Sequence, residues 1–278
     1  MIDPISFEVA PGLRLRMSRD GGSPPAFPTD SMSKGLTLEH DGLNLCEEGV
    51  GFGLPVLKQG LRAVFPGASR VTLSDPEGRH LRVQYTMNLR ERLAPRGSFL
   101  NSRPADFLKE IAGQLHRAYP FARGMLNSIS GFAYNALGIR TVFEQGRSVG
   151  VFLMDYWFDP SKGEIRMALD ASGIQRDGVT ELILLNEQGA SSFIEYSDSE
   201  GTRLSARDIG TWVPVTASEA SLRSPVHQVR FSVQSIPGAR LYRGREVAPG
   251  RLAWAGFAYL LPGCAVTFRC SVVVGAGR

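Results

Sequence analysis

The stretch that decides the fold runs from Gly150 to Asp170 and reads GVFLMDYWFDPSKGEIRMALD. Apolar and polar side chains alternate on both sides of a central DPSKG, which has the composition of a turn. Because successive side chains of a strand point to opposite faces, this pattern predicts a β-hairpin with one buried face and one outer face. The residues predicted on the buried face are Phe152, Met154, Tyr156, Phe158, Ile165, Met167 and Leu169.

The register of this hairpin follows from its apolar positions. For the two apolar sets to share a side, Asp159 has to lie opposite Glu164, because a slip of one residue would mix the two faces. The same register gives the pairs Asp155–Ala168 and Trp157–Arg166. A carboxylate, an indole and a guanidinium are therefore predicted to lie together on the outer face.

Alternation of the same kind continues through the second half of the chain. Apolar residues and a histidine occupy every second position of residues 226–235, at His227, Val229, Phe231 and Val233. Residues 264–272 repeat the pattern, with every second side chain from Cys264 onward predicted to point inward, and Pro-Gly turns separate such runs. We therefore predict an all-β, mainly antiparallel fold, a large β-sandwich or supersandwich-like meander.

One segment differs from this pattern. Apolar residues recur with helical spacing from Phe107 to Ala118, after Pro104 and before Pro120, which predicts one α-helix at about residues 104–118, packing on a sheet. Neither half of the chain shows an internal repeat or a shift in composition. We expect residues 1–278 to form a single β-rich domain, and the turn-rich residues 95–104 mark the place where a subdomain boundary would fall.

The composition limits the partners. Hydrophobic residues make up 43% and charged residues 21% of the 278 residues, which is typical of a soluble globular protein and excludes wholesale disorder. The 31 basic residues are nearly all arginines, scattered without a run, which argues against a nucleic-acid partner. The N-terminus lacks the features of a signal peptide and no stretch resembles a membrane span, so we expect a cytoplasmic protein with no membrane partner.

Cysteine and histidine spacing indicates neither a metal nor a cofactor. Cys46, Cys264 and Cys270 form no Cys-x-x-Cys pair, so we expect buried free thiols rather than a disulfide framework or a zinc ribbon. The histidines form no His-x-x-x-His pair. The glycine-rich stretch 47–55 lacks the continuation of a phosphate loop, and its alternate glycines are more typical of a bulge or of close packing than of a ligand contact.

Asp155, Trp157 and Arg166 are the candidate ligand-binding residues. The indole offers an apolar platform, while the carboxylate and the guanidinium can accept from and donate to the hydroxyls of a sugar or bind a uronate. Asp155 is also the one candidate catalytic group, although no second carboxylate is predicted at the spacing of about 5–9 Å that glycoside hydrolysis requires. The alternative is structural: a cross-strand ion pair and a Trp-Arg stack that close the sheet surface.

Other titratable residues have no predicted place near this face. A mutarotase or epimerase would pair an acid with a base, and the candidates for such a partner are His40, His227, Glu144 and Glu195. His227 falls on the apolar side of its predicted strand, where a hydrogen-bonded core histidine is the more common finding. Whether His40, Glu48 or His227 joins a site depends on the tertiary fold.

Two functions fit these observations. One is a carbohydrate-associated β-sandwich protein that binds or modifies a sugar or sugar phosphate, in analogy to the sugar sites that large β-sandwiches often carry. The other is a non-catalytic protein-interaction or assembly module, in which the same face joins a second copy or another protein and Trp157 is the interface anchor. The sequence does not decide whether the protein is an enzyme.

Overall fold

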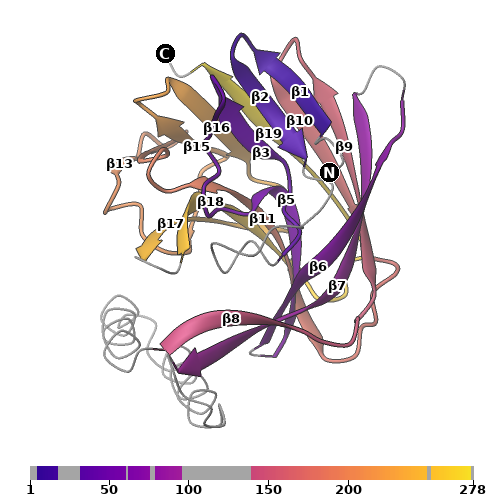
Figure 1. Ribbon diagram of the computed structural model, residues 1–278. Helices are drawn as coiled ribbons and strands as arrows, with labels where there is room; N and C mark the ends of the chain where they lie inside the picture. Colours follow the sequence, from indigo (N-terminus) through magenta and orange to yellow (C-terminus); the bar gives the residue numbers. More distant parts are fainter. Residues whose placement is uncertain are drawn as a thin grey trace.

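A computed structural model describes residues 5–17, 32–60, 62–75, 79–95, 139–248 and 252–276. Within these ranges every helix or strand element is a β-strand, and the paired strands run antiparallel (Figure 1). This confirms the predicted all-β fold. The helix predicted at residues 104–118 lies outside the described residues. In the described ranges, no helix has the length and apolar character needed to cross a membrane.

A small sheet contains the first four strands in the order β1-β2-β3-β4. Their bounds are β1 (Ile5–Ala10), β2 (Leu13–Met17), β3 (Thr37–His40) and β4 (Leu43–Asn44). Leu13, Leu15 and Met17 of β2 are buried while the arginines between them are exposed, as alternation along a strand requires. The ring of Phe7 in β1 lies 6.1 Å from that of Phe158, so this sheet packs on the inner side of the predicted hairpin.

The large sheet has 15 strands in the order β13-β12-β15-β16-β19-β10-β9-β7-β6-β5-β11-β18-β17-β14, with β8 paired to β7. The first strands along the chain are β5 (Gly51–Gln59), β6 (Arg62–Leu73), β7 (His80–Pro95), β8 (Ile139–Gln145), β9 (Val151–Asp159), β10 (Glu164–Asp170) and β11 (Val179–Gly189). The later strands are β12 (Glu195–Asp198), β13 (Arg203–Ser205), β14 (Val213–Pro214), β15 (Glu219–Ser224), β16 (Val229–Gln234), β17 (Arg240–Ala248), β18 (Leu252–Pro262) and β19 (Thr267–Ala276).

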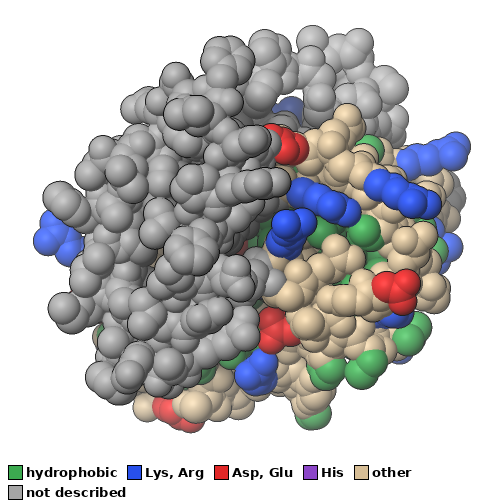
Figure 2. Space-filling model, turned by 90° about the horizontal axis from the view of Figure 1, so that it is seen from below, with side chains coloured by type: hydrophobic (Ala, Val, Ile, Leu, Met, Phe, Trp, Pro, Cys, Tyr) green, Lys and Arg blue, Asp and Glu red, His purple; other side chains and the backbone are tan. Residues whose placement is uncertain are grey.

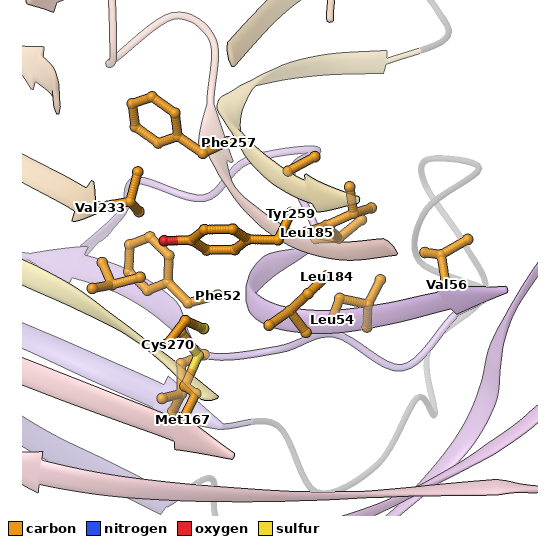
Figure 3. Packing of buried hydrophobic residues seen from close by; sticks show 14 of the residues in the cluster. Phe52, Leu54, Val56, Met167, Leu184, Leu185, Val233, Phe257, Tyr259 and Cys270 are labelled. Carbon is orange, nitrogen blue, oxygen red and sulfur yellow. The ribbon is translucent and has the colours of Figure 1, made fainter. Parts of the chain in front are cut away.

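This sheet curls so that its two parts face each other as the layers of a sandwich (Figure 1). Aromatic pairs join the layers: the ring of Phe52 in β5 lies 5.1 Å from Phe231 in β16, and that of Tyr259 in β18 lies 5.2 Å from Phe268 in β19. Figure 3 shows Tyr259 and Phe52 packed above Cys270 and Met167 of the opposite layer. The core is therefore continuous between the layers.

The hairpin β9–β10 has the predicted register. Asp159 pairs with Glu164, Trp157 with Arg166 and Asp155 with Ala168. The predicted buried face is buried, apart from Phe158, which is half-buried. In the sheet, β7 flanks this hairpin on one side and β19 on the other.

The predicted C-terminal strand is shorter than its alternation suggested. Phe268, Cys270 and Val272 point inward as expected, but β19 begins at Thr267, so Cys264 and Val266 are exposed. The reason is the turn after Pro262, which the hydrogen bond from the amide of Ala265 to the carbonyl oxygen of Pro262 closes. The expectation of three buried thiols is thus wrong for Cys264, while Cys46 and Cys270 are buried and free.

A buried polar segment, Asn186–Gln188, runs through β11 beside the glycine-rich stretch. The side-chain oxygen of Asn186 accepts the amide of Gly53 at 3.1 Å, where a bulge interrupts the pairing of β5 with β11. Gly53 has a φ of +78°, and a Cβ there would lie 2.7 Å from the hydroxyl of Tyr156. The alternate glycines therefore serve a bulge and close packing.

Charged side chains of both signs lie on the face seen from below. The described part of this surface carries Lys and Arg side chains, several of them near one another, together with Asp and Glu side chains and hydrophobic surface (Figure 2).

Candidate functional site

The candidate site lies on the outer face of four neighbouring strands, β7, β9, β10 and β19. Two rows of paired residues cross this face. One row is His80, Trp157, Arg166 and Ser271, and the other is Arg82, Asp155, Ala168 and Arg269. The sequence-predicted residues Asp155, Trp157 and Arg166 therefore share one surface with residues of two further strands.

Both oxygens of the Asp155 carboxylate are engaged. Arg82 donates from Nε to Oδ1 and from a terminal nitrogen to Oδ2, each at 2.9 Å, in the bidentate geometry that suits these two groups. The Nε2 atom of His80 lies 2.8 Å from Oδ1, and because a carboxylate only accepts, this nitrogen donates. The Asp155 side chain is 15% exposed.

These contacts determine the charge of Asp155. Partial burial raises the pKa of this carboxyl group, but the hydrogen bonds from Arg82 and His80 outweigh burial, and the pKa lies below its ordinary value. The same pair raises the pKa of the Arg82 guanidinium. Asp155 is therefore an ionised structural acceptor at neutral pH, and not a group poised to donate a proton.

Trp157 is held in place through His80. The two rings are stacked with centroids 4.9 Å apart and an angle of 11° between their planes. Since Asp155 fixes His80, a chain of contacts runs from Arg82 through Asp155 and His80 to the indole. From the sequence we predicted an ion pair and a stack on Trp157 with Arg166 as the basic partner, whereas the structure places Arg82 against Asp155 and His80 against Trp157.

The missed residues lie on β7, about 70 positions before the hairpin. A local signal exists, because His80 and Arg82 alternate with Leu81 and Val83 and must share the outer face of a strand. This alternation does not indicate which strand pairs with the strand that carries His80 and Arg82. Only the pairing of His80 with Trp157 and of Arg82 with Asp155 shows where these side chains belong.

A groove of about 520 Å³ opens on this face. It extends from Trp157 on β9 across β10 and β19 to the end of β16. Its aromatic and polar lining consists of Trp157, Glu164, Arg166, Gln234, Arg269 and Ser271. Asp155 does not line the groove. Of the three predicted site residues, two thus contact the groove and the third supports it from the side.

The other sequence candidates lie elsewhere. The rings of His40 and His227 pack against each other at 6.0 Å, and β16 begins only at Val229, so His227 belongs to the preceding turn and not to a buried strand position. Glu195 pairs with Arg223 at 2.9 Å. These residues, Glu48 and Glu144 are not among the groove residues. Among the described residues, no group of three or more His, Cys, Asp and Glu side chains is placed to hold a metal ion.

Comparisons with known proteins give a fold but no family. No protein-family model and no curated protein sequence matches this chain. Among solved structures, the α-N-acetylgalactosaminidase NagBb from Bifidobacterium bifidum in its GalNAc complex is similar, with a TM-score of 0.51 and 9% identity. The match covers 98% of this chain and 36% of the enzyme.

Two further structures show similarity of the same remote kind. The Gal-NHAc-DNJ complex of NagBb matches with a TM-score of 0.50 and 9% identity, again over 98% of this chain and 36% of that one. A galactose mutarotase-like protein from Lactobacillus casei matches with a TM-score of 0.43 and 11% identity, over 98% of this chain and 99% of its own. The chain therefore shares a β-sandwich fold with part of a carbohydrate-active enzyme, which is a link at the level of fold alone.

Proposed function

We propose that this protein binds a carbohydrate in the groove beside Trp157. Sugars present both apolar C–H faces and hydroxyl groups, and their sites combine an aromatic ring with hydrogen-bonding side chains. The groove provides the indole of Trp157 at one end and the Gln234 amide and Ser271 hydroxyl farther along.

The observation that carries the proposal is the fixed orientation of Trp157. Its ring stacks on His80, and His80 is hydrogen-bonded to a carboxylate that Arg82 holds in turn. A platform that is already ordered loses little conformational entropy when a ligand binds. These contacts order a tryptophan that is only half-buried.

The fold adds separate support. Part of an α-N-acetylgalactosaminidase solved with GalNAc has the same fold as this chain. At 9% identity this similarity transfers no residue roles, but it makes galactose-type sugars the first ligands to test.

We propose binding, and not glycoside hydrolysis, as the activity of this groove. Glu164 is the only carboxylate among its lining residues, whereas glycosidases use two carboxyl groups that flank the scissile bond. Asp155 faces β7 and has both oxygens occupied. In this proposal Asp155 is a positioning residue that acts on the ligand through His80 and Trp157.

Isothermal titration calorimetry tests the proposal. The panel contains galactose, N-acetylgalactosamine, glucose, galacturonate, glucuronate and galactose 6-phosphate. We expect at least one of these to bind, and we expect Trp157→Ala to weaken its binding by about tenfold or more, because the apolar platform is lost. Trp157→Phe retains a ring and should keep most of the affinity, while Trp212→Phe alters a tryptophan outside the groove and should have no effect.

Two results would count against a carbohydrate site. One is the absence of binding by every member of the panel to the folded protein. The other is binding that Trp157→Ala leaves unchanged. Light scattering on a dilution series addresses the interaction module: an oligomer that dissociates on dilution and is lost in Trp157→Ala would assign this face to assembly instead.

A further inference from the structure

Two arginines lie diagonally across one block of the groove floor. Arg166 on β10 pairs with Ser271 on β19, and Ala168 pairs with Arg269. The remaining two corners of the block thus carry small side chains. Diagonal neighbours on antiparallel strands lie about 7–8 Å apart, which is within the reach of two arginine side chains toward a common ligand. Of the four residues, Arg166, Arg269 and Ser271 line the groove.

The described carboxylates around this block form no salt bridge with its two arginines. Asp159 is the one that Arg166 influences: its pKa is lowered mainly by the hydrogen bond from the Ser161 hydroxyl, with smaller contributions from Lys162 and Arg166. Neither Arg166 nor Arg269 forms a salt bridge with another described residue. The carboxylate directly across from Ala168 is that of Asp155, and Arg82 and His80 occupy both of its oxygens. Glu164 is the one acidic residue of the lining, so the groove keeps an excess of positive charge.

One more carboxylate lies close to the block. Asp170, two residues after Ala168 on the same face of β10, accepts the amide of Ser172 at 2.8 Å and so caps its own turn. It forms no salt bridge with Arg269 in the described part of the chain. The two guanidinium groups therefore remain available to an anion.

We infer that the ligand of this groove is an anionic sugar whose carboxylate or phosphate group binds between Arg166 and Arg269. The inference rests on the proposed carbohydrate function and adds the chemical class of the ligand. Guanidinium groups bind carboxylates and phosphates through paired, charge-assisted hydrogen bonds, which are stronger than those between neutral groups.

The distance between Trp157 and the two arginines suits a single sugar ring that carries an acidic substituent. Trp157 lies on the strand next to Arg166, and Arg269 lies one strand farther, so the platform and the arginine block are separated by one to two interstrand spacings, about 5–10 Å. A ring on the indole then directs an acidic group at its edge toward the arginines. Ser271 and Gln234 remain for the hydroxyl groups.

The test compares neutral and anionic forms of one sugar by calorimetry at low and moderate salt. Galacturonate and galactose 6-phosphate are measured against galactose, and inorganic phosphate is measured alone. We expect the anionic sugars to bind about tenfold more tightly than galactose, and we expect added salt to reduce this difference. The acid that binds more tightly identifies the group, carboxylate or phosphate.

The variants Arg166→Gln and Arg269→Gln should each remove most of the preference for the anionic form, measured as the ratio of the affinities for the sugar acid and for galactose. Arg230→Gln is the matched control, because Arg230 is an exposed arginine of the same sheet that lies outside the groove. Its preference should equal that of the unaltered protein. Thermal unfolding verifies that all three variants fold.

Different results overturn different statements. Equal affinity for galactose and galacturonate, both weakened by Trp157→Ala, would overturn the anionic inference and leave the carbohydrate function standing. Inorganic phosphate that binds as tightly as the sugar acids, without any effect of Trp157→Ala, would also overturn the inference. No binding by any sugar would contradict the proposed function itself.

Discussion

The outer face of the hairpin β9–β10 and the buried polar segment Asn186–Gln188 of β11 both place polar residues on strands, but they do so for different purposes. On the outer face, polar groups meet in pairs across neighbouring strands and the surface stays open as a groove. In β11, Asn186 and Gln188 are fully buried, and their amides bind backbone groups that lie more than 130 residues away. The first arrangement leaves polar side chains lining an open groove, and the second joins distant parts of the chain.

We expect the largest loss of stability from a substitution in the buried segment, at the point where it joins the two sheets. The Gln188 side chain accepts the amide of Leu38 at 3.1 Å and donates to the carbonyl oxygen of Leu36 at 3.3 Å. Gln188→Leu keeps a similar volume but removes both hydrogen bonds: the buried amide of Leu38 loses its acceptor, while the carbonyl oxygen of Leu36 keeps only the amide of Phe52. We expect it to lower the free energy of unfolding in urea by about 3 kcal/mol.

Gln59→Leu is the control for this change. Gln59 is half-buried on β5 and donates to the carbonyl oxygen of Asp177 at 3.4 Å, at a site that water reaches. Its loss should cost less than about 1 kcal/mol. If both variants lose the same stability, the amide of Gln188 has no special role between the sheets.

The second prediction concerns pH and Glu187, which lies between the two buried amides. Burial raises the pKa of this carboxyl group to about 8; the amide of Val50 lowers it, Glu246 raises it and Lys34 lowers it by smaller amounts. The unfolded chain releases this proton near pH 4.5 and the folded protein only near pH 8. Stability due to Glu187 therefore falls as the pH rises through this window.

Glu187→Gln removes this titration and retains an acceptor for Val50. We expect the variant to match the unaltered protein near pH 4.5 and to exceed its stability above pH 8 by on the order of 2 kcal/mol, measured by urea unfolding at each pH. Glu181→Gln changes a half-buried carboxylate near the start of the same strand and is the control, because it should not raise the stability above pH 8. A difference for Glu187→Gln that does not change with pH would show that this carboxyl group is not buried in the charged form.

The same comparison shows how far sequence reasoning extends. The register of β9–β10 could be predicted because a short turn joins the two strands and the alternation of apolar residues admits only one alignment. The placement of His80 and Arg82 could not, because β7 is joined to β9 through a long connection and many alignments would satisfy its own pattern. The partners of Asn186 and Gln188 were equally out of reach, since the residues that they bind follow from the tertiary fold alone.

We expect the smallest loss of stability from Asp155→Asn on the outer face. Because Arg82 and His80 lower the pKa of Asp155 in the folded protein, the stability that this carboxylate contributes is present above its unfolded pKa of about 3.9 and is lost as the pH falls through the lower folded value. The Arg82 side chain is 53% exposed, so water replaces much of what the pair loses. We expect Asp155→Asn to cost about 1 kcal/mol at pH 7 in urea unfolding and less at pH 2.5. Asp170→Asn, on the same face but without a salt bridge to a described residue, should show no such loss at either pH. Loss of the same size at pH 2.5 and pH 7 would mean that the shape of Asp155, and not its charge, holds His80 against Trp157.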